Sequence, residues 1–211
     1  MTAKKKETTK VTVLNKHNLA IHKLAPKERM YYLNGIHVTD DFTEVTNGHY
    51  LVRVSTLRED MDEIPNNPDG KAPTIKPVET VIKAEDAKDI ERSLPKERGL
   101  PAVDEKAWFL EQTAEKIELG AFKKGWTVEP MEGKFANTNS VWPKDTPEIE
   151  LAFDAGYMET LCGFIRKAFK SNYNDPKVTL KLYGAEKPIE MKAENSDTGQ
   201  TIEVLLMPVR M

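Results

Sequence analysis

The chain has 211 residues, of which 39% are apolar and 31% are charged. This composition is typical of a soluble globular protein with one or two domains. The net charge of −3 excludes a protein whose whole surface is cationic, although positive charge can still gather on one face. Cys162 is the only cysteine, so no intrachain disulfide can form, and we expect a reducing, cytoplasmic location.

The first block of the chain begins with a polar segment, residues 1–10, which lacks the apolar centre of a signal peptide. Its three consecutive lysines indicate a solvated terminus rather than an arm that contacts phosphate. No apolar run is long enough to cross a bilayer, so we expect no membrane partner. The predicted elements are a short helix between Asn15 and Leu24 and four strands, at residues 11–14, 31–38, 43–45 and 51–54. Asp40 and Asp41 indicate a turn between two of these strands.

The middle block lies between two stretches rich in proline and polar residues, 59–77 and 136–147, which we interpret as connectors. Within it, Val81 and Ile82 indicate a strand, and Ala87, Ile90 and Leu94 share the spacing of a short helix. Three strands are then predicted at residues 108–110, 117–121 and 126–128.

The last block has the clearest pattern. Ile149, Leu151 and Phe153 alternate with other residues as in a half-buried strand. Asp154 occupies a helix N-cap position, and an amphipathic helix follows that ends before Pro176. Its apolar face is predicted to consist of Tyr157, Met158, Leu161, Cys162, Ile165, Ala168 and Phe169. Three alternating strands, at residues 178–182, 189–193 and 202–206, complete the block.

The order strand, helix, three strands therefore occurs three times, which predicts an α+β fold with helices on one face of antiparallel sheets. We place two of these units in a domain at residues 1–138 and the third in a half domain at residues 139–211. Such units leave open sheet edges, along which they tend to pair.

Four short motifs stand out, in residues 31–38 with 44–51, residues 132–135 with 141–143, residues 149–157 and residues 205–211. All four are similar to motifs of the bacterial DNA polymerase III beta subunit, the beta sliding clamp family. Residues 31–38 followed by residues 44–51 resemble the family's "YLNG" and "ATDGHRL" strands, and residues 205–211 resemble its terminal "VMPMRL". Residues 132–135 with 141–143 resemble "EGKFP…VIP", and residues 149–157 resemble "I-x-FN-x-x-YL". The sequence departs from these motifs at Asn47, Tyr50 and Met211, where the family has Asp, Arg and Leu.

The resemblance implies a shortened clamp that performs no catalysis and needs no cofactor. Sliding clamps close into a ring around duplex DNA, with helices lining the hole, and tether DNA polymerase and clamp-loader proteins. A homo-oligomer is therefore expected. Chains of three units would need four copies for a family-like ring of twelve units, a reading with four units in two domains would need three copies, and a dimer with a shared domain is a further alternative. The rival hypothesis is a non-encircling peptide-binding or decoy protein.

The resemblance implies that basic residues of the helices contact DNA phosphates, and such contact needs no base recognition, so that the ring can slide. The candidates are Arg166, Lys167 and Lys170 in the last helix, and Lys23 and Lys27, with Lys16 and Arg29, near the first. Favourable placement at a helix C-terminus explains the last helix equally well. The middle helix carries Glu85, Asp86, Asp89 and Glu91 against Lys88 and Arg92, and is a poor phosphate-facing surface.

The resemblance also implies a pocket for an apolar partner peptide, with two walls. One wall would consist of Thr46, Gly48, His49, Tyr50 and Leu51, and the other of Leu205, Met207, Pro208, Val209 and Arg210. The flexible side chain of methionine suits varied apolar anchors. The alternative is that Leu205 and Met207 cap the core and that Pro208 ends the last strand.

Catalytic interpretations find little support. His17, His22, His37 and His49 lack metal-ligand spacing, so no metal site is expected. Cys162, on the predicted apolar helix face, is interpreted as a core thiol. Gly133 and Lys134 lack the remainder of a phosphate-binding loop. Trp108, Trp126 and Trp142 are interpreted as core or interface anchors rather than base-stacking platforms.

Overall fold

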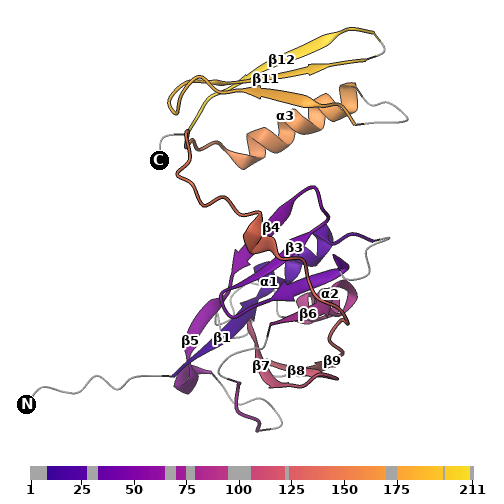
Figure 1. Cartoon of the computed structure of the whole chain (residues 1–211), viewed down its shortest axis with the longest axis vertical. Coiled ribbons are helices and arrows are strands. Elements are labelled where there is room, and N and C mark those ends of the chain that lie inside the picture. Colours follow the sequence, from indigo (N-terminus) through magenta and orange to yellow (C-terminus); the bar gives the residue numbers. More distant parts are fainter. Residues whose placement is uncertain are drawn as a thin grey trace, which may run out of the picture. The chain divides into compact units, whose positions relative to one another are not determined.

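The structure is a computed structural model that describes residues 9–27, 33–64, 70–74, 79–94, 106–121, 124–169, 175–196 and 198–209. The chain divides into two compact units, residues 1–142 and 143–211 (Figure 1). The sequence had placed this division four residues earlier, after residue 138. Among the described residues, no helix has the length and apolar character needed to span a membrane.

Unit 1, residues 1–142, contains two modules that each comprise a strand, a helix and three further strands. The first has β1 (Lys10–Asn15), α1 (Lys16–Ala20), the 3-10 helix η1 (Ile21–Leu24), β2 (Gly35–Val38), β3 (Phe42–Thr46) and β4 (Leu51–Ser55). The short strand β5 (Leu57–Asp60) and the 3-10 turn η3 (Met61–Glu63) extend it. The second has β6 (Thr80–Lys83), α2 (Ala84–Ser93), β7 (Lys106–Gln112), β8 (Ile117–Ala121), β9 (Lys124–Val128) and, further on, η5 (Thr138–Ser140).

The two modules of unit 1 exchange their first strands. The sheet of the first module has the order β4-β3-β2-β6, and that of the second has the order β5-β1-β7-β8-β9. β1 thus pairs antiparallel with β7, and β6 pairs antiparallel with β2. Each first strand has a second neighbour from its own module, which is β5 for β1 and Pro130, after β9, for β6. The exchange joins the modules into one domain.

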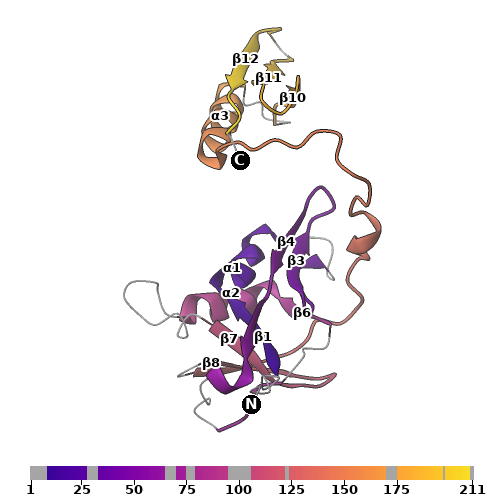
Figure 2. The same ribbon diagram turned by 90° about the vertical axis from the view of Figure 1, so that its left-hand side faces the viewer.

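The helices of unit 1 lie side by side over a shared core (Figure 2). Leu19 of α1 and Ile90 of α2 are fully buried against apolar residues of both sheets. Although α1 has only five residues, Asn15 and Asn18 form a reciprocal capping box at its start. The buried Asn18 amide also donates to the Val54 and Ser55 carbonyls, at 3.3 and 3.0 Å, and so ties α1 to β4.

A buried polar network on the opposite face of the β4-β3-β2-β6 sheet holds the segment that leaves unit 1. Glu44 is 1% exposed and accepts hydrogen bonds from Arg53, at 2.7 Å, and from the Thr138 hydroxyl, at 2.8 Å. A His37 ring nitrogen lies 2.7 Å from the same carboxylate, and the imidazole stacks on Phe135. Burial alone would raise the pKa of Glu44, but the hydrogen bonds from His37, Arg53 and Thr138 outweigh it, so the pKa lies below its usual value.

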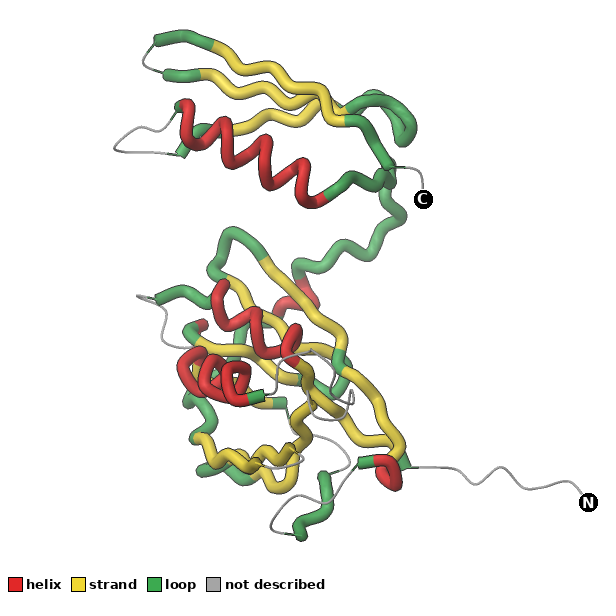
Figure 3. Tube along the Cα trace, turned by 180° about the vertical axis from the view of Figure 1, so that it is seen from behind, coloured by secondary structure: helices red, strands yellow, loops and turns green. Residues whose placement is uncertain are grey.

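Unit 2, residues 143–211, is a third module, and its described residues form one helix. The helix α3 (Ala155–Ala168) lies along one face of the three-stranded sheet β10-β11-β12 (Figure 3). The strands are β10 (Val178–Lys181), β11 (Ile189–Glu194) and β12 (Thr201–Leu206). Asp154 caps α3 by accepting hydrogen bonds from the amides of Gly156 and Tyr157.

The structure is the α+β fold that the sequence predicts, with antiparallel sheets and helices on one face, but it corrects several local predictions. Residues 149–153 are not a strand, since Ala152 makes only an isolated bridge to Val209. β5 extends into residues 59–77, a segment interpreted as a connector, and η3 lies within that segment. The predicted apolar face of α3 is too wide, because Tyr157, Cys162 and Ala168 are exposed. Cys162 is therefore not a core thiol. Tyr31 and Tyr32 lie outside the described residues.

Candidate nucleic-acid interface and peptide-binding surface

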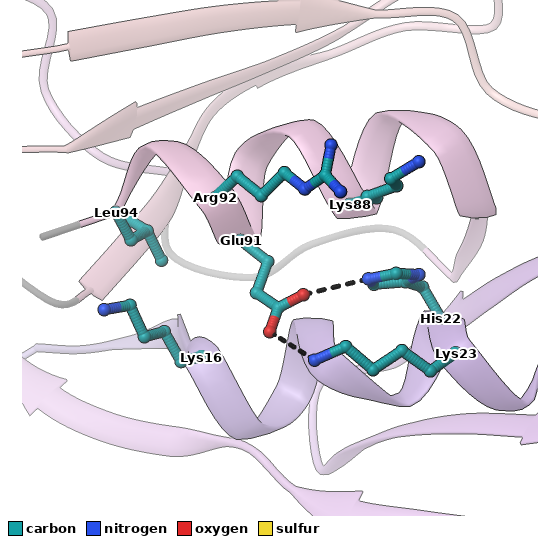
Figure 4. A pocket seen from close by; sticks show the side chains of 7 residues that line it. All are labelled: Lys16, His22, Lys23, Lys88, Glu91, Arg92 and Leu94. Atoms are coloured by element: carbon teal, nitrogen blue, oxygen red, sulfur yellow. Dashed lines mark hydrogen bonds and ion pairs between the residues drawn. The ribbon is translucent and has the colours of Figure 1, made fainter. Parts of the chain in front are cut away.

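A cluster of cationic side chains lies between the two helices of unit 1. Lys16 and Lys23 come from the α1 and η1 segment, and Lys88 and Arg92 come from α2 (Figure 4). Together with His22, Glu91 and Leu94 they line a hollow of about 640 Å³, which we call the helix-face hollow. Lys88 and Arg92 form no ion pair with any residue that the structure describes. Four cations around one carboxylate give this face a local excess of positive charge.

Glu91 organises the helix-face hollow. Its carboxylate accepts a hydrogen bond from Lys23 at 2.8 Å and lies 2.9 Å from a His22 ring nitrogen (Figure 4). Burial would raise the pKa of Glu91, but the hydrogen bonds from Lys23 and His22 prevail, so the pKa is lower than usual. Glu91 therefore stays ionised at neutral pH and fixes two of the surrounding side chains in place.

The cations of α3 lie on the exposed surface of unit 2. Arg166 and Lys167 are both exposed in the last turns of the helix, next to the fully buried Ile165. At 100° per residue, Lys167 lies on the side opposite Ile165, which faces the sheet. Lys167 is thus directed away from the core of unit 2.

The turn between β3 and β4 is held by its own side chains. The Thr46 hydroxyl donates to the Tyr50 carbonyl at 2.5 Å and accepts from the Gly48 amide. The Asn47 side chain accepts hydrogen bonds from the amides of His49 and Tyr50. Gly48 has a φ of +87°, a backbone conformation that residues other than glycine rarely adopt. The turn is therefore a preformed part of unit 1.

The C-terminal tail of unit 2 exposes apolar side chains beside a second hollow. Leu205, Met207 and Val209 are 69%, 64% and 51% exposed. A hollow of about 470 Å³, which we call the tail hollow, is lined by Glu150, Leu151, Ala152, Ala185, Glu186, Met207, Pro208 and Val209. The bridge from Ala152 to Val209 holds the tail against the segment before α3. Exposed apolar residues around a hollow are typical of peptide-binding surfaces.

The comparison with solved structures decides the fold. The chain matches the beta sliding clamp of C. crescentus with a TM-score of 0.64 at 14% identity, over 99% of this chain and 53% of that one. The fold is that of a bacterial sliding clamp. The clamp of Bartonella birtlesii, solved bound to griselimycin, matches with a TM-score of 0.64 at 17% identity, over 100% of this chain and 54% of that one. The clamp of Bacillus subtilis gives a TM-score of 0.63 at 12% identity.

This clamp-like chain spans about half the length of the solved clamps that it matches. The shortened clamp form that the sequence motifs indicated therefore agrees with the comparison. No family model matches the sequence. No curated protein matches it either.

Of the basic residues that the sequence predicts to face DNA, some line the helix-face hollow of this clamp-like fold and others do not. Lys23 lines the helix-face hollow, whereas Lys27 is exposed but is not one of its lining residues. Sequence reasoning discounted α2 because it counted the charges of the whole helix. The hollow is lined by Lys88 and Arg92 and by none of Glu85, Asp86 and Asp89. Helical periodicity alone could not have separated these two groups, because Glu85 and Arg92 are seven residues apart and share one side of α2. Arg29, Lys170 and Arg210 lie outside the described residues.

The predicted peptide-binding residues of the clamp-like chain form two groups, one in unit 1 and one in unit 2. Within each group, the described residues lie close together. Thr46 and Leu51 flank the turn in unit 1. Met207, Pro208 and Val209 line the tail hollow in unit 2, while Leu205 is exposed on β12. Among the described residues, no group of three or more His, Cys, Asp or Glu side chains could hold a metal ion.

Proposed function

We propose that this chain is a sliding-clamp-like processivity factor that encircles duplex DNA as a homo-oligomer and tethers replication proteins. The observation that carries the proposal is the clamp fold, which extends over the whole chain. In this role the protein holds replication enzymes on DNA and catalyses no reaction itself. The absence of a second cysteine is in keeping with work in the cytoplasm.

The helix faces would provide the contact with DNA. Lys16, Lys23, Lys88 and Arg92 in unit 1 are supported by their clustering, and Arg166 and Lys167 in unit 2 by their exposure. Lys27 and Lys170 are added from the sequence alone. Cations that contact phosphates without reading bases hold a ring on DNA and still allow it to slide.

The tail hollow would accept the apolar anchors of a polymerase or clamp-loader peptide. Met207 and Val209 offer exposed apolar surface there, and Pro208 lies between them. Leu205 and Arg210 flank this surface in the sequence. The residues Thr46, Gly48, His49, Tyr50 and Leu51 are proposed as further peptide contacts on the strength of the motif resemblance.

Retention on circular DNA tests the proposal. The protein is loaded on closed circular duplex DNA, with a loader if one is required, and the complex is isolated by gel filtration at moderate salt. We expect the protein to stay with the circle and to be lost once the DNA is cut at one site, because a ring slides off a free end. Equal retention on circular and linear DNA would contradict encirclement.

A non-encircling peptide-binding protein is the second candidate. It is favoured by the tail hollow, which is lined by residues of unit 2 alone and therefore needs no ring. In that case a clamp-binding peptide binds the chain, while the circular DNA experiment shows no dependence on topology.

A further inference from the structure

In each of the three modules, the segment before the helix pairs with a later segment of its own module. In the first two modules it also pairs with a strand of the other module. In the first module, β1 lies between β5 of its own module and β7 of the second. In the second, Ile82 of β6 pairs on one side with Pro130 of its own module and on the other with Ile36 of β2. In the third, Ala152 pairs with Val209 of its own module, and no described residue pairs with its other side.

The acceptor for such a strand also lies open on the third module. β7 and β2, which accept the exchanged strands in unit 1, are each the first strand after the helix. The equivalent strand of unit 2 is β10, which lies at the edge of its sheet. An unpaired edge strand exposes a row of backbone donors and acceptors that favours pairing with another strand.

Apolar side chains around this edge are exposed, although they belong to the face that the helix covers. Leu180 lies opposite the buried Met191 and so points to the α3 side of the sheet, yet it is 51% exposed. Leu182 is 44% exposed, and Phe164 and Tyr157 on the flank of α3 are 57% and 67% exposed. In unit 1 the corresponding flank of α1 is packed against α2. Exposed apolar surface of this extent indicates an interface.

We propose that residues 149–153 of one chain pair antiparallel with β10 of a second copy of this chain, so that two C-terminal units build one shared clamp-type domain. Both the donor segment and the acceptor edge belong to the same module. Two copies related by a twofold axis therefore satisfy each other reciprocally, as a closed dimer requires. The proposal concerns self-association of the chain and holds whether or not the protein encircles DNA.

Unit 1 also sets the register of this pairing. There, the residue just before the helix N-cap faces the core and pairs with the first core-facing residue of the acceptor strand, as in Leu14 with Ala107 and Ile82 with Ile36. The same rule places Phe153 opposite Val178 and Leu151 opposite Leu180. Ala152 then lies opposite Thr179 on the outer face.

Side-chain chemistry suits this register. The segment 149–153 presents Ile149, Leu151 and Phe153 on one side, and these face the exposed apolar residues of the partner's edge. On the other side, Glu150 lies opposite Lys181, whose amino group already binds Glu190 in its own chain at 2.5 Å. Apolar contacts on the inner face and opposite charges on the outer face support the same alignment.

The mass of the full chain in solution is the first test. Sedimentation equilibrium should give twice the 23.9 kDa of one chain, or a multiple of it if rings form. Leu180→Glu should raise the dimer dissociation constant about tenfold or more, because it places a charge in the centre of the interface. Leu205→Glu is the matched control, since it changes a leucine that is also exposed but lies on the outer face of the same sheet, and it should leave the dimer intact.

A disulfide tests the register and separates a loss of pairing from a loss of folding. In a Cys162→Ser background, Ala152→Cys with Thr179→Cys should give a covalent dimer on oxidation, since directly opposed residues have the spacing that a disulfide needs. Ala152→Cys with Thr201→Cys, which moves the second thiol to the far edge of the sheet, should not. A monomer at high concentration, a dimer insensitive to Leu180→Glu, or equal cross-linking of both pairs would overturn the proposal.

Discussion

The charge of Glu44 makes the stability of unit 1 depend on pH. Because the folded pKa lies below the usual 4.5, this group stabilises the fold above that value, and the contribution is lost as the pH falls through the folded pKa. Glu44→Gln leaves Arg53 without its buried carboxylate and should lower the free energy of unfolding by about 3 kcal/mol at neutral pH. Urea unfolding between about pH 3 and pH 7 measures both effects.

A second variant, measured in the same urea unfolding experiments, serves as the control. Glu159→Gln changes an exposed carboxylate on α3 and should reproduce the pH dependence of the unchanged protein. Glu44→Gln should instead show a shallower decline in stability on acidification. If both variants decline with the same slope, the network around Glu44 does not determine the acid sensitivity of unit 1.

Peptide binding can be tested at Met207 and Leu51. The double variant Met207→Ala, Leu51→Ala should weaken a clamp-binding peptide by more than ~1 kcal/mol, because two apolar contacts are removed. Fluorescence anisotropy of a labelled peptide gives the affinity, and circular dichroism checks that the fold persists. Val141→Ala removes an exposed side chain outside the tail hollow and should change nothing. Unchanged affinity in the double variant would refute the assignment of these residues.

At the level of elements, sequence periodicity predicted what depends on neighbours along the chain. The alternation in residues 189–193 and 202–206 predicted β11 and β12, and Asp154 predicted the start of α3. β5 was missed because Leu57-Arg-Glu-Asp has no apolar alternation; what makes it a strand is its pairing with β1. The strand exchange between modules is equally nonlocal, since nothing within β1 or β6 specifies which sheet it joins.

In the third module, residues 149–153 and Cys162 also show that sequence periodicity cannot predict contacts between distant parts of the chain. The alternating pattern of residues 149–153 is that of a strand, but a strand forms only where a second strand is available. Among the described residues of one chain, only Ala152 has a pairing partner. The helical spacing of Cys162 puts it near the apolar face, yet a single sheet beneath α3 covers too narrow a stripe to bury it.

The paired helices of unit 1 make a prediction about DNA binding. Lys88→Ala with Arg92→Ala should weaken binding to duplex DNA regardless of sequence and reduce the slope of log K against log salt by about 2, because two phosphate contacts are lost. Titrations between about 50 and 200 mM salt measure the slope. Lys116→Ala with Lys192→Ala removes the same charge from strand-associated positions and should leave the slope unchanged. Equal effects of the two pairs would contradict a specific role for the helix-face hollow.

For the whole molecule, the two units should respond differently to protein concentration. A unit completed by a second copy gains stability by mass action, by roughly 1.4 kcal/mol per dimer for each tenfold rise in concentration, whereas a unit complete within one chain gains none. Unit 1 pairs both of its exchanged strands internally. In the described part of unit 2, one side of the donor segment and the outer edge of β10 have no paired strand. We therefore expect the thermal midpoint of unit 2 alone to rise with concentration.

The distribution of tryptophan allows the two transitions to be separated. Trp108, Trp126 and Trp142 all precede residue 143, so tryptophan fluorescence follows unit 1 only, while far-ultraviolet circular dichroism follows both units. The fluorescence midpoint should stay constant over a hundredfold range of concentration, and the circular dichroism curve should contain a second transition that moves. In Leu180→Glu the second transition should become independent of concentration. A fluorescence midpoint that shifts together with the circular dichroism curve would mean that self-association involves unit 1, and the shared domain would then have to be abandoned.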